Sequence, residues 1–401
     1  PSSSSSSSCL ASHSTLATVS FRPCSPPSSL SLSFSLFQLF FVSAHSGVIY
    51  DYGTRTQQLL QGHCNPITCS VVSADKRWVA TADAGADSMI VVWDTLSTTP
   101  IKTLFNPHPC GVQAMAMTPD AMFLATLSAP DPDDPSAAQQ IALWEWTVDR
   151  SDPLYVADVV GDDLQTAIAF NPSDCREVVT NSASRVQFWS WESKAWTFYA
   201  PQLSKVDFPN AGAFTQSCFI PDTHKCITAT KAGALILWDR SMVGVSEGHG
   251  NPTDRRATKM LPLSQLGIGV VATAGDYVVV GSDDGAVRFY DFQFRLHAWF
   301  EDLDAGPVTS VSFANMLPPP PLDQGGFTVA DFVVGTSKAL VVGVDPLCFN
   351  ELTADRRRGT LLTQGIDSEI CGTAVHPARP HLAIVAASGT GWSLPDTCRC
   401  K

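Results

Sequence analysis

The stretch SMIVVWDTLSTTPIKTL, residues 88–104, decides the fold. It contains an apolar run that ends in Trp93-Asp94, a polar turn, and a second short run. Short runs that are rich in β-branched and aromatic residues and bounded by polar turns are typical of β-strands. The stretch therefore predicts two neighbouring antiparallel strands.

The same pattern recurs along the chain. Its copies are GVIYDY (47–52), MIVVWD (89–94), IALWEW (141–146), VQFWSW (186–191), ALILWD (234–239) and AVRFYD (286–291), with a weaker copy at ALVVGVD (339–345). Successive copies lie roughly 40 to 55 residues apart, which is the period of a four-stranded propeller blade.

Each interval also contains two earlier alternating runs, for example ITCSVVS (67–73) and RWVATAD (77–83). No window of helical length shows the 3.6-residue apolar spacing of a helix. A four-stranded sheet with two apolar faces is not stable alone, whereas sheets packed face to face around a channel bury both faces. We therefore predict an all-β WD-repeat β-propeller of about seven blades.

The blade count suggests how the ring closes. Six units are complete, from Ile67 to about Leu362, while residues 47–61 supply two closing strands and residues 368–388 supply two opening strands. We expect these two halves to pair across the termini, because an open ring would expose strand edges. The propeller is then expected to span residues 42–391.

Residues 1–41 have a different composition. They are rich in serine and proline and have almost no charge, which predicts disorder or a mis-joined segment. The apolar run from Leu30 to Val42 is too short to cross a bilayer and has the length of a signal-peptide core, but strand-like residues follow it directly. Residues 392–401 read as an aberrant tail.

The first complete unit carries the polar signature of WD repeats. In that family a His, a Ser or Thr, an Asp and a Trp form a hydrogen-bonded chain that ties loops to strands. The resemblance implies these roles for His63, Thr81, Asp87 and Trp93.

The unit VGSDDGAVRFYD (280–291) is the next best match to this signature. By the same resemblance, Ser282, Asp284 and Tyr290 are expected to belong to an equivalent network. Other units are degenerate: Ala232 stands where the turn Asp is expected, and Ser190 follows Trp189 where Asp is usual.

Charge and cysteine content narrow the class of protein. The chain has 38 acidic and 25 basic residues, a net charge of −13, which disfavours nucleic acid as a partner and favours proteins. The 12 cysteines follow no paired spacing, which indicates a reducing compartment. Cys69, Cys218 and Cys371 lie in apolar runs and are expected to be core residues.

The sequence offers no residues for catalysis. GIGVVA (267–272) has the glycine spacing of a dinucleotide-binding motif. It is followed by strand-like residues and not by a helix, so no helix N-terminus is expected to bind a pyrophosphate. Neither the His63, Cys64 and Cys69 group nor Cys398 with Cys400 has a second pair at zinc spacing. We predict no enzyme activity, no cofactor and no metal; a propeller enzyme would need inward-facing His, Asp or Glu.

Three loops remain as surface features. The acidic run APDPDDPS (129–136) lacks the glycine and distal glutamate of a calcium loop and predicts a solvated insertion. Arg356, Arg357 and Arg358 form the one basic cluster, either a partner-binding loop or a solvated one. MLPPPPLDQGG (316–326) fits a stiff loop or a ligand for a proline-recognising domain.

The amino-acid sequences of the repeat units resemble those of a particular family. SADKRWVATADAGADSMIVVWD, MAMTPDAMFLATLS, FNPSDCREVVTNSASRVQFWSW and GDYVVVGSDDGAVRFYD are similar to the N-terminal WD-repeat region of the cilia- and flagella-associated protein 251 family, also called WD-repeat-containing protein 66. The similarity runs from about Val42 to Ala387.

The resemblance implies a non-enzymatic scaffold. Members of that family are subunits of the calmodulin- and spoke-associated complex, on axonemal doublets near the radial-spoke bases of motile cilia. The implied partners are radial-spoke and calmodulin-complex subunits and doublet proteins, with no nucleic acid and no membrane. Family members continue into further WD repeats and an EF-hand-like tail, so calcium or calmodulin roles are not assigned here. The alternative is a cytosolic WD-repeat adaptor, such as a substrate receptor or trafficking subunit.

Overall fold

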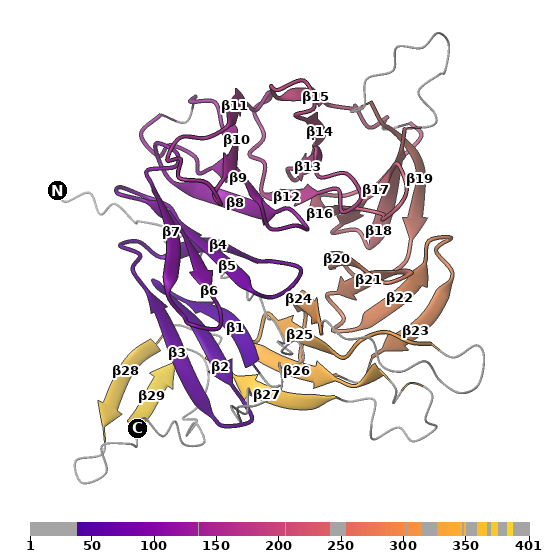
Figure 1. Cartoon of the computed structure of the whole chain (residues 1–401). Helices are drawn as coiled ribbons and strands as arrows, with labels where there is room; N and C mark the ends of the chain where they lie inside the picture. Colours follow the sequence, from indigo (N-terminus) through magenta and orange to yellow (C-terminus); the bar gives the residue numbers. More distant parts are fainter. Residues whose placement is uncertain are drawn as a thin grey trace, which may run out of the picture.

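A computed structural model shows the chain as a ring of β-sheets (Figure 1). The structure describes residues 38–134, 136–204, 206–240, 254–301, 303–314, 327–346, 349, 359–366, 370–375 and 383–387. These ranges contain 29 β-strands and no α-helix. The prediction of an all-β fold is confirmed.

The stretch quoted first forms two paired strands of one sheet. Its apolar run is β6 (Met89–Asp94), and its second run is β7 (Pro100–Phe105). They follow β4 (Ile67–Val72) and β5 (Trp78–Asp83), and the four strands lie side by side in chain order. In β6 every residue from Ile90 to Asp94 is buried, because a central strand of a packed sheet has both faces covered.

Five further four-stranded sheets follow the same order. They consist of β8 (Val112–Met117), β9 (Phe123–Ser128), β10 (Gln140–Glu145) and β11 (Tyr155–Asp158); β12 (Ala167–Phe170), β13 (Glu177–Asn181), β14 (Val186–Ser190) and β15 (Thr197–Tyr199); β16 (Phe214–Phe219), β17 (Lys225–Thr230), β18 (Ala234–Asp239) and β19 (Arg256–Pro262); β20 (Ile268–Ala274), β21 (Tyr277–Ser282), β22 (Val287–Asp291) and β23 (Leu296–Phe300); and β24 (Val308–Phe313), β25 (Phe332–Thr336), β26 (Leu340–Val344) and β27 (Thr360–Gln364). Six complete units beginning at Ile67 were predicted, and six are present.

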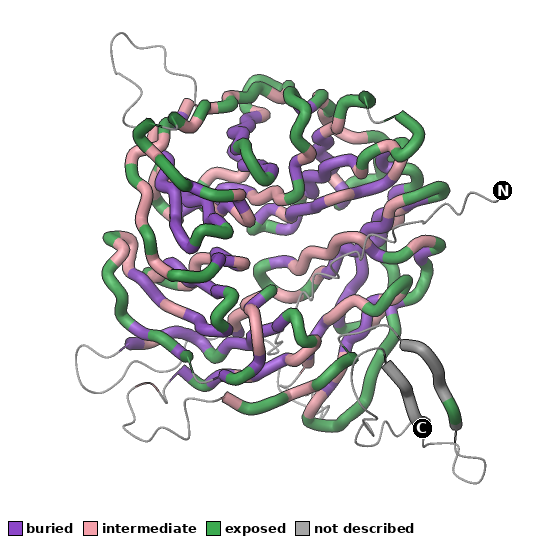
Figure 2. The backbone as a smooth tube through the Cα atoms, turned by 180° about the vertical axis from the view of Figure 1, so that it is seen from behind, coloured by how far each residue is buried: buried purple, intermediate pink, exposed green. Residues whose placement is uncertain are grey.

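A seventh sheet precedes these six. It has three strands, β1 (Gln38–Ser43), β2 (Ser46–Asp51) and β3 (Thr56–Gln61). We number the sheets in chain order from blade 1 (β1–β3) to blade 7 (β24–β27). In Figure 1 the first strand of each four-stranded blade faces the centre of the ring and the fourth lies at its outside. Buried residues gather in the strands and exposed ones in the turns (Figure 2).

Successive blades touch closely at their inner strands. The Thr215 hydroxyl of blade 5 donates to the Ile268 carbonyl of blade 6 at 2.7 Å, and Thr68 of blade 2 bonds the Val112 carbonyl of blade 3 in the same way. Gly111 makes the second of these approaches possible. It has φ +86°, and a Cβ there would lie 2.4 Å from the Ala84 Cα, so only glycine fits.

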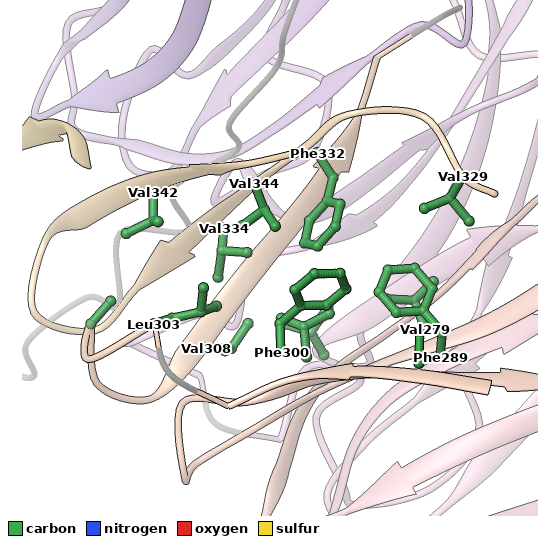
Figure 3. Close-up of a cluster of buried hydrophobic side chains, with 14 of the residues drawn as sticks. Val279, Phe289, Phe300, Leu303, Val308, Val329, Phe332, Val334, Val342 and Val344 are labelled. Atoms are coloured by element: carbon green, nitrogen blue, oxygen red, sulfur yellow. The ribbon is translucent and has the colours of Figure 1, made fainter. Parts of the chain in front are cut away.

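Apolar and aromatic side chains fill the space between blades. In the cluster between blades 6 and 7, Phe289 and Phe300 meet Phe332, with ring centroids 5.4 and 5.3 Å from that of Phe332 (Figure 3). Valines 334, 342 and 344 of blade 7 complete the layer. Because each blade buries both faces in this way, stability comes from the closed series of interfaces.

One interface also contains a buried ion pair. Arg255, just before β19 in blade 5, lies 2.7 Å from Glu177 of blade 4, with side chains 1% and 6% exposed. The guanidinium carbon sits 4.9 Å from the ring centre of Phe188 and 5.2 Å from that of Phe219. A buried charge needs such a partner, because its desolvation cost is otherwise uncompensated.

Blade 1 closes the ring by apolar packing. On one side Phe40, Ile49 and Leu60 pack against Trp93 and its neighbours in blade 2. On the other side Leu39 packs against Val333 and Val341 of blade 7. The seven blades therefore form a closed β-propeller.

The expected pairing of the terminal strands is not formed among the described residues. The strands β28 (Ile370–Val375) and β29 (Ala383–Ala387) pair with each other as a separate hairpin, which lies outside the ring beside β3 (Figure 1). The error arose from blade 1, which has three strands and not two. The extra strand, β1, begins at Gln38, so the expected propeller start at residue 42 falls inside it.

Candidate functional site

Three of the predicted network residues of blade 2 are joined by hydrogen bonds. The Trp93 indole Nε1 donates to the Thr81 hydroxyl at 2.8 Å, and that hydroxyl lies 2.8 Å from Nε2 of His63. His63 belongs to the connection between β3 and β4, so the bonds tie a loop to two central strands. All three side chains are buried, and buried polar groups are stable only when bonded in this way.

The acid of this network is Asp83, and the assignment to Asp87 was wrong. Asp83 is fully buried, and its Oδ2 lies 3.4 Å from the His63 Nδ1. It also accepts the Met89 amide at 2.6 Å and the Asn65 amide at 3.2 Å. Burial raises the pKa of this carboxyl, but these bonds and His63 outweigh it, so the pKa is lowered. Asp87 is exposed, with φ +55°.

Turn length explains the error. Between the last paired residues of β5 and β6 the connection covers residues 83–89, whereas the equivalent turn of blade 6 covers residues 282–286. The two extra residues move Asp87 to the exposed tip and leave Asp83 at the buried start of the turn.

A second network in blade 3 was missed from the sequence. His108 Nε2 lies 2.8 Å from the Thr126 hydroxyl, which accepts the Trp144 Nε1–H at 2.9 Å. The signal that would have revealed it is spacing, because His108 precedes Thr126 by 18 residues, as His63 precedes Thr81. Ser128 replaces Asp83 in register. Burial lowers the pKa of His108 to about 4, so its imidazole is neutral at pH 7.

Acidification is expected to destabilise the protein through His108. The unfolded histidine has a pKa of 6.5 and the folded one about 4, so between these values the unfolded chain binds a proton that the folded chain does not. The contribution of the neutral His108 to the free energy of unfolding is therefore fully present above pH 6.5. It is lost as the pH falls toward 4, by up to about 3 kcal/mol. Urea unfolding near pH 7.5 and pH 5 measures this loss.

The control for this effect is His108→Gln, which can still bond Thr126 but does not titrate. The parent should lose about 2 kcal/mol more than this variant between the two pH values. Equal losses would show that His108 does not set the acid sensitivity.

Blades 4 and 5 keep only the second half of the network. Trp189 donates to the Thr180 hydroxyl at 3.0 Å, and Trp238 donates to the Thr228 hydroxyl at 2.9 Å. Four consecutive blades thus share one bond between a second-strand threonine and a third-strand indole. This bond fixes the two central strands of each blade.

Blade 6 departs from the prediction that joined Ser282, Asp284 and Tyr290. In blade 2 Thr81 is paired with Val91, and the equivalent pair in blade 6 is Val280 with Arg288. Val280 therefore occupies the position of Thr81, and it has no hydroxyl that Tyr290 could bond. Ser282 instead bonds Asp284 at 2.6 Å, and Arg288 bonds both of them. The sequence match was misaligned, because Ser282 occupies the register of Asp83 and not of Thr81.

The inner strands of the six four-stranded blades contain no charged residue. Strands β4, β8, β12, β16, β20 and β24 contain no Asp, Glu, His, Lys or Arg. No group of three or more His, Cys, Asp and Glu that could hold a metal occurs among the described residues. Burial raises the pKa of Cys69 and Cys218 to about 12, which makes their thiols poor nucleophiles.

Five predicted features lie outside the described residues. These are residues 1–37 of the serine- and proline-rich segment, the proline-rich loop 316–326, the basic cluster Arg356, Arg357 and Arg358, the tail 392–401, and the Cys398 and Cys400 pair within it. No helix in the described ranges has the length and apolarity to cross a membrane.

The closed ring and the repeated Thr–Trp bond define a seven-bladed WD-repeat β-propeller. Comparison with known families then places it: the CFAP251 N-terminal domain matches residues 26–349. The chain belongs to the cilia- and flagella-associated protein 251 family, which confirms the resemblance seen in the sequence.

Individual relatives agree with this placement. The chain is 38% identical to cilia- and flagella-associated protein 251 of Chlamydomonas reinhardtii, over 87% of this chain and 45% of that protein. It is 30% identical to the Mus musculus protein of that name, over 88% of this chain and 27% of that protein. Echinoderm microtubule-associated protein-like 4 of Mus musculus is 22% identical, over 84% of this chain and 32% of that protein. The chain thus spans less than half of each relative.

Proposed function

We propose that this chain is a non-enzymatic scaffold of the ciliary or flagellar axoneme, organising proteins near the radial-spoke bases. Membership of the cilia- and flagella-associated protein 251 family is the observation that carries the proposal. The more distant relative named as microtubule-associated fits doublet proteins as partners. Radial-spoke and calmodulin-complex subunits are the other partners that we propose.

The form of the molecule supports a scaffold. Its central strands are fixed by buried bonds, while connections of varied length leave both edges of the ring. Such a rigid core with variable loops can hold several partners in fixed relative positions. The inner strands of blades 2 to 7 contain no Asp, Glu, His, Lys or Arg, the residues that most often act as general acids and bases.

Fractionation of cilia tests the proposal. The tagged protein, expressed from its own gene, should remain with detergent-stripped doublets, and high-salt extraction should release it together with radial-spoke and calmodulin-complex subunits. A tag-only strain controls for carry-over. Recovery solely from the cytosol, without these subunits, would contradict the scaffold and favour a cytosolic adaptor.

A further inference from the structure

Four connections meet at one edge of blades 3 and 4. They are the turns β9–β10 (129–139) and β13–β14 (182–185), and the links β11–β12 (159–166) and β15–β16 (200–213). Antiparallel strands alternate in direction, so turns from the second to the third strand and links to the next blade leave the sheet at the same end. We call this surface the acidic edge.

Hydrogen bonds and one ion pair join three of the four connections of the acidic edge. Gln139 of the first turn accepts the Gln165 amide at 2.8 Å and donates to the Gln165 carbonyl at 3.0 Å. The Gln187 side chain holds the Val160 carbonyl at 2.7 Å. Arg185 lies 3.9 Å from Asp163, which joins the next turn. These contacts hold the β9–β10, β11–β12 and β13–β14 connections against one another.

The charge of this edge is one-sided. Its connections contain six acids, Asp131, Asp133, Asp134, Asp162, Asp163 and Asp207, and two bases. Of the bases, Arg185 is paired with Asp163, and Lys205 lies outside the described residues. The opposite edge of the same blades mixes Asp120, Asp149, Asp152, Asp174 and Glu192 with Arg150, Arg176 and Lys194. A positively charged partner is therefore favoured at the acidic edge.

Apolar surface lies among these acids. A hollow of about 940 Å³ opens beside Arg185 and is lined in part by Leu203, Phe208 and Phe214. The Val160 side chain is 54% exposed and that of Val206 is 89% exposed. Exposed apolar side chains of this kind are suited to anchor a partner, because their burial on binding is favourable.

Unused acceptors lie beneath the acidic edge. Gln165 and Gln187 are fully buried, and the Oε1 atom of each has no hydrogen-bond partner. Their amide nitrogens donate to carbonyls of the β11–β12 link, at Asp163 and Val160. Because both side chains are fully buried, a partner on the acidic edge does not reach these oxygens.

We propose that the acidic edge binds a protein segment that combines lysine or arginine with apolar side chains. The basic groups meet the aspartates of the β9–β10 and β11–β12 connections, while the apolar groups cover Val160 and Val206 and enter the hollow. This proposal rests on the scaffold function and gives one partner a stated chemistry. Acidic partners, including nucleic acid, are repelled from this edge.

A defined peptide tests the edge directly. The purified full chain is titrated into a fluorescent amphipathic peptide of lysine and leucine, with anisotropy read at low and high salt. Matched peptides carry glutamate for lysine or serine for leucine. The first peptide should bind, more weakly at high salt, and each matched peptide should bind at least about tenfold more weakly.

Matched double variants locate the binding. Asp133→Lys with Asp162→Lys reverses two charges on the acidic edge, and Asp149→Lys with Asp152→Lys makes the same change on the opposite edge. The first pair should weaken binding about tenfold or more and the second less than about twofold. Val206→Ser should weaken binding without changing its salt dependence.

Equal effects of the two double variants, or binding of the glutamate peptide, would overturn the proposal. Because the peptide experiment needs no cilia, it can fail while the protein still fractionates with doublets. The converse outcome, peptide binding by a cytosolic protein, would overturn only the proposed ciliary function.

Discussion

Replacing Glu177 with glutamine is expected to lower the free energy of unfolding by about 3 to 5 kcal/mol. The glutamine keeps the size of the side chain but removes the counter-charge of Arg255, which stays buried between Phe188 and Phe219. Glu177 also accepts the Asn171 amide at 2.8 Å, a bond that weakens with the loss of charge. Urea unfolding monitored by tryptophan fluorescence measures the change.

Glu192→Gln is the matched control. It removes the same charge from the ion pair with Arg176, whose side chains are 57% and 48% exposed, and should cost less than about 1 kcal/mol. The combined change Glu177→Leu with Arg255→Met should recover most of the stability, because it leaves no buried charge. Similar losses from Glu177→Gln and Glu192→Gln would show that burial does not govern this pair.

Replacing Phe289 with alanine is expected to lower the free energy of unfolding by about 3 to 5 kcal/mol. The ring is fully buried and lies 5.0 to 6.4 Å, between centroids, from the rings of five other aromatic residues. Blade 6 and blade 7 meet through this cluster, and its removal leaves a cavity that neighbouring rings cannot fill (Figure 3). Thermal melting and urea unfolding both report the loss.

Phe105→Ala provides the comparison for a surface ring. The Phe105 side chain is 71% exposed at the end of β7, so its removal should change stability by no more than about 0.5 kcal/mol. A loss at Phe289 as small as that at Phe105 would mean that the interface between blades 6 and 7 is not packed as described.

The fold could be predicted because its signal is repeated. One apolar run that ends in aromatic and polar residues is a weak signal, but six copies at near-regular spacing restrict the architecture to stacked four-stranded sheets. Alternation also placed the start of the first complete unit at Ile67, where β4 begins. What alternation could not resolve was blade 1, because β1 continues a serine-rich, apolar run that resembles a targeting segment in composition.

The network was harder to predict, because it depends on register. His63, Thr81 and Trp93 were assigned by resemblance to the WD-repeat signature, but choosing between Asp83 and Asp87 requires the length of the turn in space. The same limitation led to Ser282 in place of Val280. Composition alone gave the net acidity of the chain, whereas its concentration at one edge follows from which turns leave the sheets at the same end.

The three-stranded first blade has a mechanical consequence. From blade 2 to blade 7, each pair of neighbouring blades is in contact through its inner strands. Blade 1 has no inner strand among the described residues. Where blade 1 meets blade 7, the buried apolar residues in the described part of the chain are Leu39, Val333 and Val341. A tensile load applied through the loops is distributed around the closed ring, and the ring opens first at its weakest junction. Under repeated bending, we expect the junction between blade 1 and blade 7 to separate before the others.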